Sequence, residues 1–165
     1  MAAEITSIAL LVYLAAASMA IAAASFCESA GDRNLCEELT RSATTWAEAM
    51  TNGLQIALAK VESGKSIADG VESKLPADMT QQTKQSLVRT CEEDYETAIY
   101  NLNQCLGFVD RDPNSSLNVY LSAVSLSDCI DGLNEFQVSL PEVEEYGGQI
   151  VKLSSTLLCV ASKKP

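Results

Sequence analysis

The apolar positions of this chain recur every three or four residues through most of its length, which is typical of helices that bury one face. Pro76, Pro113 and Pro141 each fall between two such stretches, where proline interrupts no helix. No strand-like alternation of any length occurs. The pattern predicts an all-α protein, an up-down-up-down four-helix bundle with short loops. The expected helices cover about 41–62, 79–107, 114–132 and 142–162.

Glycines and one tryptophan refine this expectation. Gly64 is expected to end the first helix as its C-cap. Gly147 and Gly148 weaken the first turns of the fourth helix and are expected to delay its start. Trp46 falls on the apolar stripe of the first helix, so we expect it to pack in the core rather than to stack on a sugar.

The N-terminus carries an uncharged apolar run, Ile8–Ala24, which ends in small residues. Its last three alanines fit the A-x-A cleavage pattern of a secretory signal peptide, although no basic residue precedes the run. A membrane anchor is the alternative, but the run is at the short limit for spanning a bilayer. The expected organisation is a signal peptide at 1–24 and a mature domain at 25–165, with an N-terminal hairpin at 25–40 and the bundle at 41–162.

Charge and composition exclude several functions. The chain has 11 basic and 22 acidic residues, and only Glu4 lies in the leader, so the mature charge is −10. Such a protein is repelled by nucleic acid and by anionic membrane surfaces, and it attracts basic proteins. It has no histidine, CxxC pair, Gly-rich phosphate loop or G-x-S-x-G motif. We therefore expect no enzyme, and no catalytic residue, metal site or cofactor.

Six cysteines in a secreted chain suggest disulfides. Cys27 and Cys36 flank a Gly-Asp turn signal, so a bond between them would close a short hairpin ahead of the bundle. Cys91 and Cys129 lie symmetrically about residue 110, in the loop between the second and third helices. This symmetry puts them at the same height on adjacent antiparallel helices, where they can bond.

Cys105 and Cys159 remain. Cys105 shares a helix with Cys91 at a distance of roughly 21 Å, so those two cannot bond each other. The helices of Cys105 and Cys159 are diagonal in a simple bundle. Two separate thiols are therefore expected, and a third bridge is the alternative.

Three segments resemble the plant invertase and pectin methylesterase inhibitors. They are the spaced cysteine hairpin, "TCEEDYETAIYNL" with its Cys-x-x-x-Tyr-x-x-Ala-x-x-x-Leu pattern, and "LNVYLSAVSLSDCIDGL". The resemblance implies a four-helix bundle with an N-terminal helical hairpin and disulfides Cys27–Cys36 and Cys91–Cys129. It also implies a secreted inhibitor of the apoplast or cell wall, which binds a carbohydrate-active enzyme one to one and blocks its cleft.

Two targets compete within that family. Its invertase inhibitors often carry a Pro-Lys-Phe motif after the second bundle helix, whereas here Pro113 is followed by Asn114 and Ser115. The segment "LNVYLSAV" is closer to the pectin methylesterase inhibitors. Pectin methylesterase is therefore the expected partner. Acid invertase is one alternative, and a secreted helical binding protein without inhibitory activity is another.

The outward faces of the second and third helices offer polar and aromatic side chains that suit a protein interface. For any one of them an ordinary solvated surface is the alternative. Asn114 begins an Asn-Ser-Ser glycosylation sequon. Because interfacial carboxylates take up protons when they are desolvated, we also expect pH-sensitive affinity. The expected contact residues are Glu92, Glu93, Glu96, Tyr100, Asn103, Asn118 and Ser122.

Overall fold

The computed structural model describes residues 26–111 and 115–165. The expected signal peptide and the sequon residue Asn114 lie outside these residues. The described parts contain helices and no strand, which confirms the all-α prediction. The elements are α2 (Arg33–Leu39), α3 (Trp46–Asp69), the short 3₁₀ helix η1 (Glu72–Lys74), α4 (Gln81–Phe108), α5 (Ser116–Ser122), α6 (Ser127–Glu135) and α7 (Pro141–Ala161).

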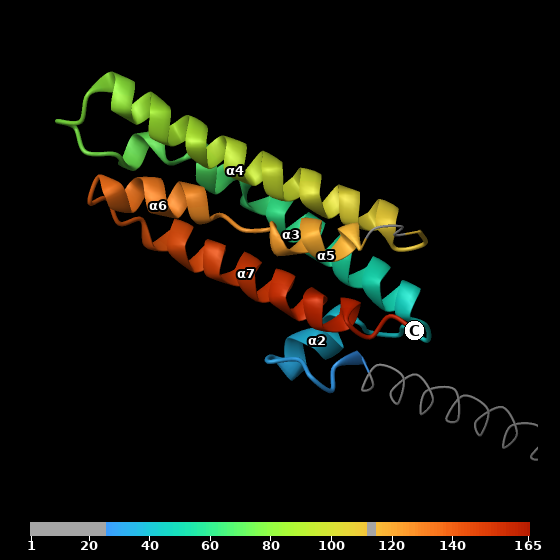
Figure 1. The fold of residues 1–165 in the computed structure, drawn as a ribbon. Coiled ribbons are helices and arrows are strands. Elements are labelled where there is room, and N and C mark those ends of the chain that lie inside the picture. Colours follow the sequence, from blue (N-terminus) through green and yellow to red (C-terminus); the bar gives the residue numbers. More distant parts are fainter. Residues whose placement is uncertain (1–25, 112–114) are drawn as a thin grey trace, which may run out of the picture.

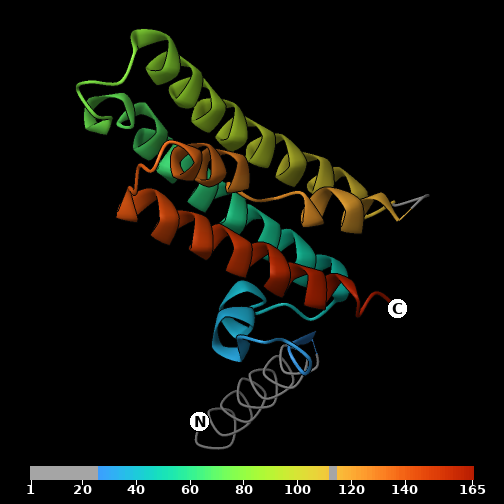
Figure 2. The same cartoon turned by 60° about the vertical axis from the view of Figure 1, so that its left-hand side comes forward.

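The bundle has four positions, and α3, α4 and α7 fill three of them as long helices (Figure 1). The two short helices α5 and α6 follow one another in the third position, between α4 and α7. The N-terminal α2 packs outside the bundle against α3 and α7, as the turned view also shows (Figure 2). This is the expected bundle with an N-terminal extension.

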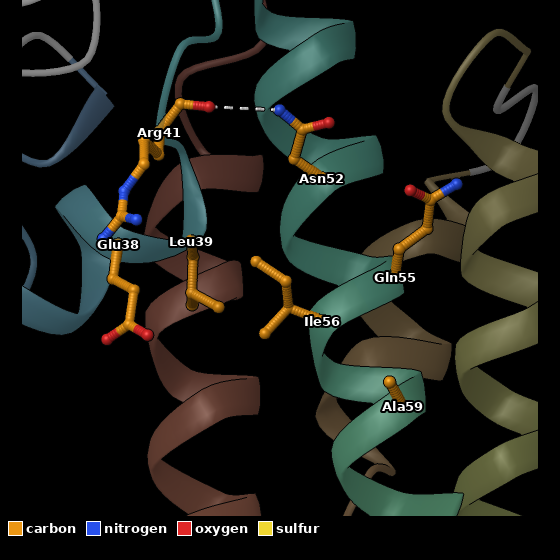
Figure 3. Close-up of a pocket in the computed structure, with 7 residues that line it drawn as sticks. All are labelled: Glu38, Leu39, Arg41, Asn52, Gln55, Ile56 and Ala59. Atoms are coloured by element: carbon orange, nitrogen blue, oxygen red, sulfur yellow. Dashed lines mark hydrogen bonds between the residues drawn. The ribbon is translucent and has the colours of Figure 1, made fainter.

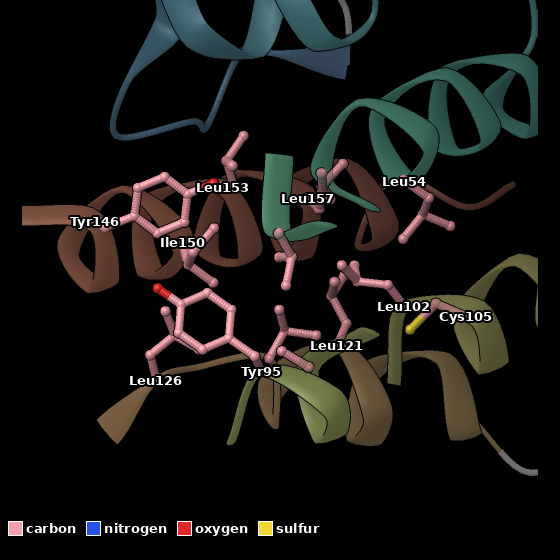
Figure 4. Packing of buried hydrophobic residues seen from close by; sticks show 14 of the residues in the cluster. Leu54, Tyr95, Leu102, Cys105, Leu121, Leu126, Tyr146, Ile150, Leu153 and Leu157 are labelled. Atoms are coloured by element: carbon pink, nitrogen blue, oxygen red, sulfur yellow. The ribbon is translucent and has the colours of Figure 1, made fainter. Parts of the chain in front are cut away.

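Apolar side chains from all four positions meet in one core (Figure 4). Leu54 of α3, Leu102 of α4, Leu121 of α5 and Leu157 of α7 are all fully buried. Burial of this apolar surface is the main source of stability. The predicted face of the fourth helix is buried throughout, at Val143, Tyr146, Ile150, Leu153, Leu157 and Val160.

Trp46 is buried, as predicted, at the first turn of α3. Its indole Nε1 donates a hydrogen bond to the carbonyl of Val160 at 2.9 Å, which satisfies the only polar atom of the side chain. This bond ties the start of α3 to the end of α7. Thr45 caps α3 together with Glu48 in a capping box, so the helix begins there and not at residue 41.

The two glycine predictions are wrong. Gly64 lies inside α3, which continues for five more residues, because the ring of Tyr146 packs against its bare Cα. Helix α7 starts at Pro141 without delay. Gly147 is buried there, and an added Cβ would come within 2.6 Å of Ile130. In both cases tertiary packing outweighs the low helix propensity of glycine.

The third position differs from the single helix expected over 114–132, because it is broken at residues 123–126. Buried residues fall at 117, 121 and 124 in the first part and at 126, 129 and 133 in the second. The step of two residues between Val124 and Leu126 changes the buried face, so one straight helix could not bury both sets.

Two disulfides are present, between Cys27 and Cys36 and between Cys91 and Cys129, with Cα–Cα distances of 5.6 and 4.3 Å. These are the two pairings expected from the sequence. Cys105 is buried, and its thiol faces the carbonyl of Leu117 at 3.7 Å. Cys159 is half-buried and does not bond Cys105.

Candidate protein-docking face

The outer surface of α4 carries a stripe of exposed residues. Glu93, Glu96, Tyr100 and Asn103 follow at intervals of three and four, so they share one face of the helix. Glu92 lies beside this stripe and is half-buried. The structure therefore brings five of the seven expected contact residues onto one side of α4.

The acids of this stripe have partners. Arg89 Nε donates to Glu93 Oε1 at 2.6 Å, and this bond raises the pKa of the arginine. Lys65 of α3 lies 3.6 Å from Glu96. Both pairs are exposed, where water and salt screen the attraction. A basic partner could therefore compete for these carboxylates at low cost.

The other two expected residues point elsewhere. Asn118 and Ser122 are exposed on α5, one turn apart, with Tyr120 midway between them. Side chains two residues apart on a helix do not face the same way, and the ring of Tyr120 points to α4. Asn118 and Ser122 therefore lie on the side of α5 away from the α4 stripe. Ser122 is also occupied locally, because its hydroxyl donates to the carbonyl of Val119.

An aromatic patch, which we define as Tyr100, Phe108 and Tyr120, joins α4 to α5. The rings of Tyr100 and Tyr120 are 6.3 Å apart, and those of Phe108 and Tyr120 are 5.6 Å apart. Tyr100 is 55% exposed, and the neighbouring Val119 is 66% exposed. Phe108 and Tyr120 are half-buried. An exposed aromatic ring supported by half-buried rings suits the centre of a protein interface.

Sequence reasoning found Tyr100 and missed the rest of this surface. Tyr120 and Phe108 belong to different helices, and only the packing of α4 on α5 brings them together. A signal was present at Val119, an apolar residue at an outward position between the buried Leu117 and Leu121.

A groove of about 420 Å³ lies elsewhere, between α2 and α3 (Figure 3). Asn52 Nδ2 donates there to the carbonyl of Arg41 at 3.4 Å, and Ile56 is exposed in its wall. The lining holds one carboxylate and no nucleophile, so the groove has no acid–base pair to offer. The lining residues are Glu38, Leu39, Arg41, Asn52, Gln55, Ile56 and Ala59.

The described residues also show neither a metal site nor a membrane-spanning helix. Across residues 26–111 and 115–165, no group of three His, Cys, Asp or Glu side chains could hold a metal ion. Among the helices that the structure describes, none is long and apolar enough to cross a membrane.

Comparisons with known proteins agree with this fold. A sequence model of the family described as "Plant invertase/pectin methylesterase inhibitor" matches residues 21–160. The crystal structure of mutant form A of a pectin methylesterase inhibitor from Arabidopsis is similar, with a TM-score of 0.66 and 16% sequence identity. The similarity covers 86% of this chain and 96% of that chain, and at this identity it shows the shared fold. No curated protein matches this chain.

Proposed function

This chain belongs to the plant invertase/pectin methylesterase inhibitor family, and from that premise we propose that it inhibits a pectin methylesterase. It binds the enzyme one to one and covers the substrate cleft with the face formed by α4 and α5. The observation that carries the proposal is the aromatic patch together with the exposed acids Glu93 and Glu96 of α4. The similar Arabidopsis structure is itself titled as a pectin methylesterase inhibitor, which supports this choice of target.

Inhibition of this kind needs shape and rigidity rather than a reaction. The Cys91–Cys129 bond joins α4 to α6, the helix that follows α5, so part of the scaffold of the face is restrained before binding and loses less conformational entropy in the complex. Tyr100 supplies the central aromatic contact. Glu93 and Glu96 lie near it and attract a basic enzyme surface, which speeds the encounter.

The proposal extends to the setting of the protein. The chain is secreted into the apoplast through the leader at 1–24 and acts in the cell wall as a domain of residues 25–165. It is an inhibitor and not an enzyme, and it needs no cofactor. Its partner is a protein, since its mature charge of −10 repels nucleic acid and anionic membranes.

Acid invertase is the second candidate, because the description of the matched family names both enzymes. Pro113 is not followed by the Lys-Phe pair that often marks the invertase inhibitors, and this departure favours pectin methylesterase.

The test is an inhibition titration with the oxidised protein secreted from the full chain, against a plant pectin methylesterase and an acid invertase. We expect inhibition of the esterase at one equivalent and a loss of affinity of at least about tenfold in Tyr100→Ala. Phe136→Ala is the matched control, because Phe136 is a similarly exposed aromatic residue outside the patch. Inhibition of neither enzyme by the wild-type protein would refute the proposal.

A further inference from the structure

The break between α5 and α6 contains neither proline nor glycine. No local helix breaker therefore explains the break, and contacts from other parts of the molecule must hold it in place. A helix of only seven residues, such as α5, is also too short to be stable alone. Contacts from a neighbouring helix must therefore set the position of α5.

Two buried polar side chains of α4 supply such contacts at the break. Asn101 Nδ2 donates to the carbonyl of Ala123, the C-cap residue of α5, at 3.1 Å. Asp94 Oδ2 accepts from the backbone N–H of Cys129, in the first turn of α6, at 3.0 Å. Leu126, the N-cap residue of α6, has no polar side chain, so Asp94 caps this helix from outside.

Both side chains are almost inaccessible, at 6% exposure for Asn101 and 9% for Asp94. They lie seven residues apart, two helical turns along the same side of α4. Buried polar groups are costly unless their hydrogen bonds are made, so these two strongly favour the one arrangement that satisfies them. Cys105 completes the attachment, because its thiol faces the carbonyl of Leu117 near the other end of α5.

The attachment matters because α5 carries part of the docking face. Val119 and Tyr120 belong to α5, whereas Tyr100 and Phe108 belong to α4. The contact between the rings of Tyr100 and Tyr120 therefore depends on how α5 is seated on α4.

We propose that Asn101 and Asp94 are positioning residues for target binding: they hold the two ends of the break and so fix α5, with Tyr120 and Val119, against α4. This inference rests on the proposed function, since it concerns the same face. Neither side chain reaches the surface to touch a target. Their effect on affinity passes entirely through the placement of α5.

The test combines amide hydrogen exchange on the uncomplexed protein with inhibition of a plant pectin methylesterase. Asn101→Ala leaves the carbonyl of Ala123 without its donor. We expect faster exchange over residues 115–127 and an inhibition constant raised by roughly tenfold. Asp94→Ala has the same expected effect, whereas Asp94→Asn keeps an oxygen for the Cys129 N–H and holds affinity within about twofold.

The control is Val61→Ala in α3, because α5 packs mainly against α4 and α7. The variant leaves a cavity in the core and lowers stability. Its inhibition constant should stay within about twofold of the wild-type value. Equal weakening by Val61→Ala and Asn101→Ala would overturn the inference, because general destabilisation would then explain both. Unchanged exchange over 115–127 in Asn101→Ala would also overturn it.

Failure of the proposed function gives a different result. In that case the wild-type protein inhibits no esterase, and the claim about affinity falls with it. The exchange measurement needs no target, and it still decides whether the buried pair holds α5 in place.

Discussion

Gly64→Ala tests the packing that the sequence concealed. Gly64 is buried inside α3, and an added Cβ would overlap the ring of Tyr146 and come within 2.7 Å of its hydroxyl oxygen. The ring cannot move aside freely. Its hydroxyl donates to the carbonyl of Lys60 and lies 3.1 Å from Ser63 Oγ, and its face stacks on Tyr95 with centroids 6.3 Å apart.

The magnitude follows from opposing contributions. Replacing glycine by alanine inside a helix stabilises by about 1 kcal/mol. Overpacking costs about 1–3 kcal/mol, and the displaced tyrosine loses hydrogen bonds worth about 1 kcal/mol each. We therefore expect the free energy of unfolding to fall by about 2 kcal/mol. For a domain of this size, the melting temperature should fall by about 4–8 °C.

The assay is thermal unfolding followed by far-ultraviolet circular dichroism, with Gly148→Ala as the matched control. Gly148 is exposed inside α7, and an added Cβ there meets nothing within 4 Å. It should gain about 0.5–1 kcal/mol from helix propensity alone. If both variants are stabilised equally, the ring of Tyr146 does not restrict Gly64 and the reasoning is refuted.

Three further predictions follow from single groups. The hydroxyl of Tyr95 is buried and has no hydrogen-bond partner within the described residues. Tyr95→Phe should therefore leave the free energy of unfolding unchanged or raise it by up to about 1 kcal/mol. A loss of stability on denaturant titration would contradict this. Burial raises the pKa of Asp94, and the charges of Asp128 and Asp131 raise it further. The hydrogen bond from the Cys129 N–H lowers it, but the net shift of the pKa is upward. The folded state thus binds this proton more tightly than the unfolded state, so the contribution of Asp94 to stability falls as pH rises from about 4 through its folded pKa. Asp94→Asn should be the more stable protein at neutral pH and should lose this part of the pH dependence; parallel stability curves for the two proteins would count against it. Finally, the Asn114 sequon should be occupied in protein secreted from a plant host, which a loss of mass on glycosidase treatment would show and an unchanged mass would exclude.

The parts of this fold that could be predicted are those set by local periodicity and chain symmetry. The buried face of α7 repeats over six apolar positions, so one helix and its inward side follow directly from the sequence. The Cys91–Cys129 bond follows from the folding of two antiparallel helices about the loop between them. Neither inference requires knowledge of what lies across the core.

The features that sequence reasoning missed depend on a second element. Gly64 seemed to be a helix end because propensity is local, whereas the packing of Tyr146 is not. The break after α5 could have been suspected from the two-residue step between Val124 and Leu126. The aromatic patch could not, because neither helix alone shows that Tyr120 turns toward Tyr100.

The most direct test of the central claim is amide hydrogen exchange of the secreted protein in complex with a plant pectin methylesterase. If the face formed by α4 and α5 covers the enzyme cleft, exchange should slow over residues 93–108 and 115–123. Exchange at the groove between α2 and α3 should not change. Protection centred on that groove, with exchange over α4 and α5 unaltered, would contradict the account.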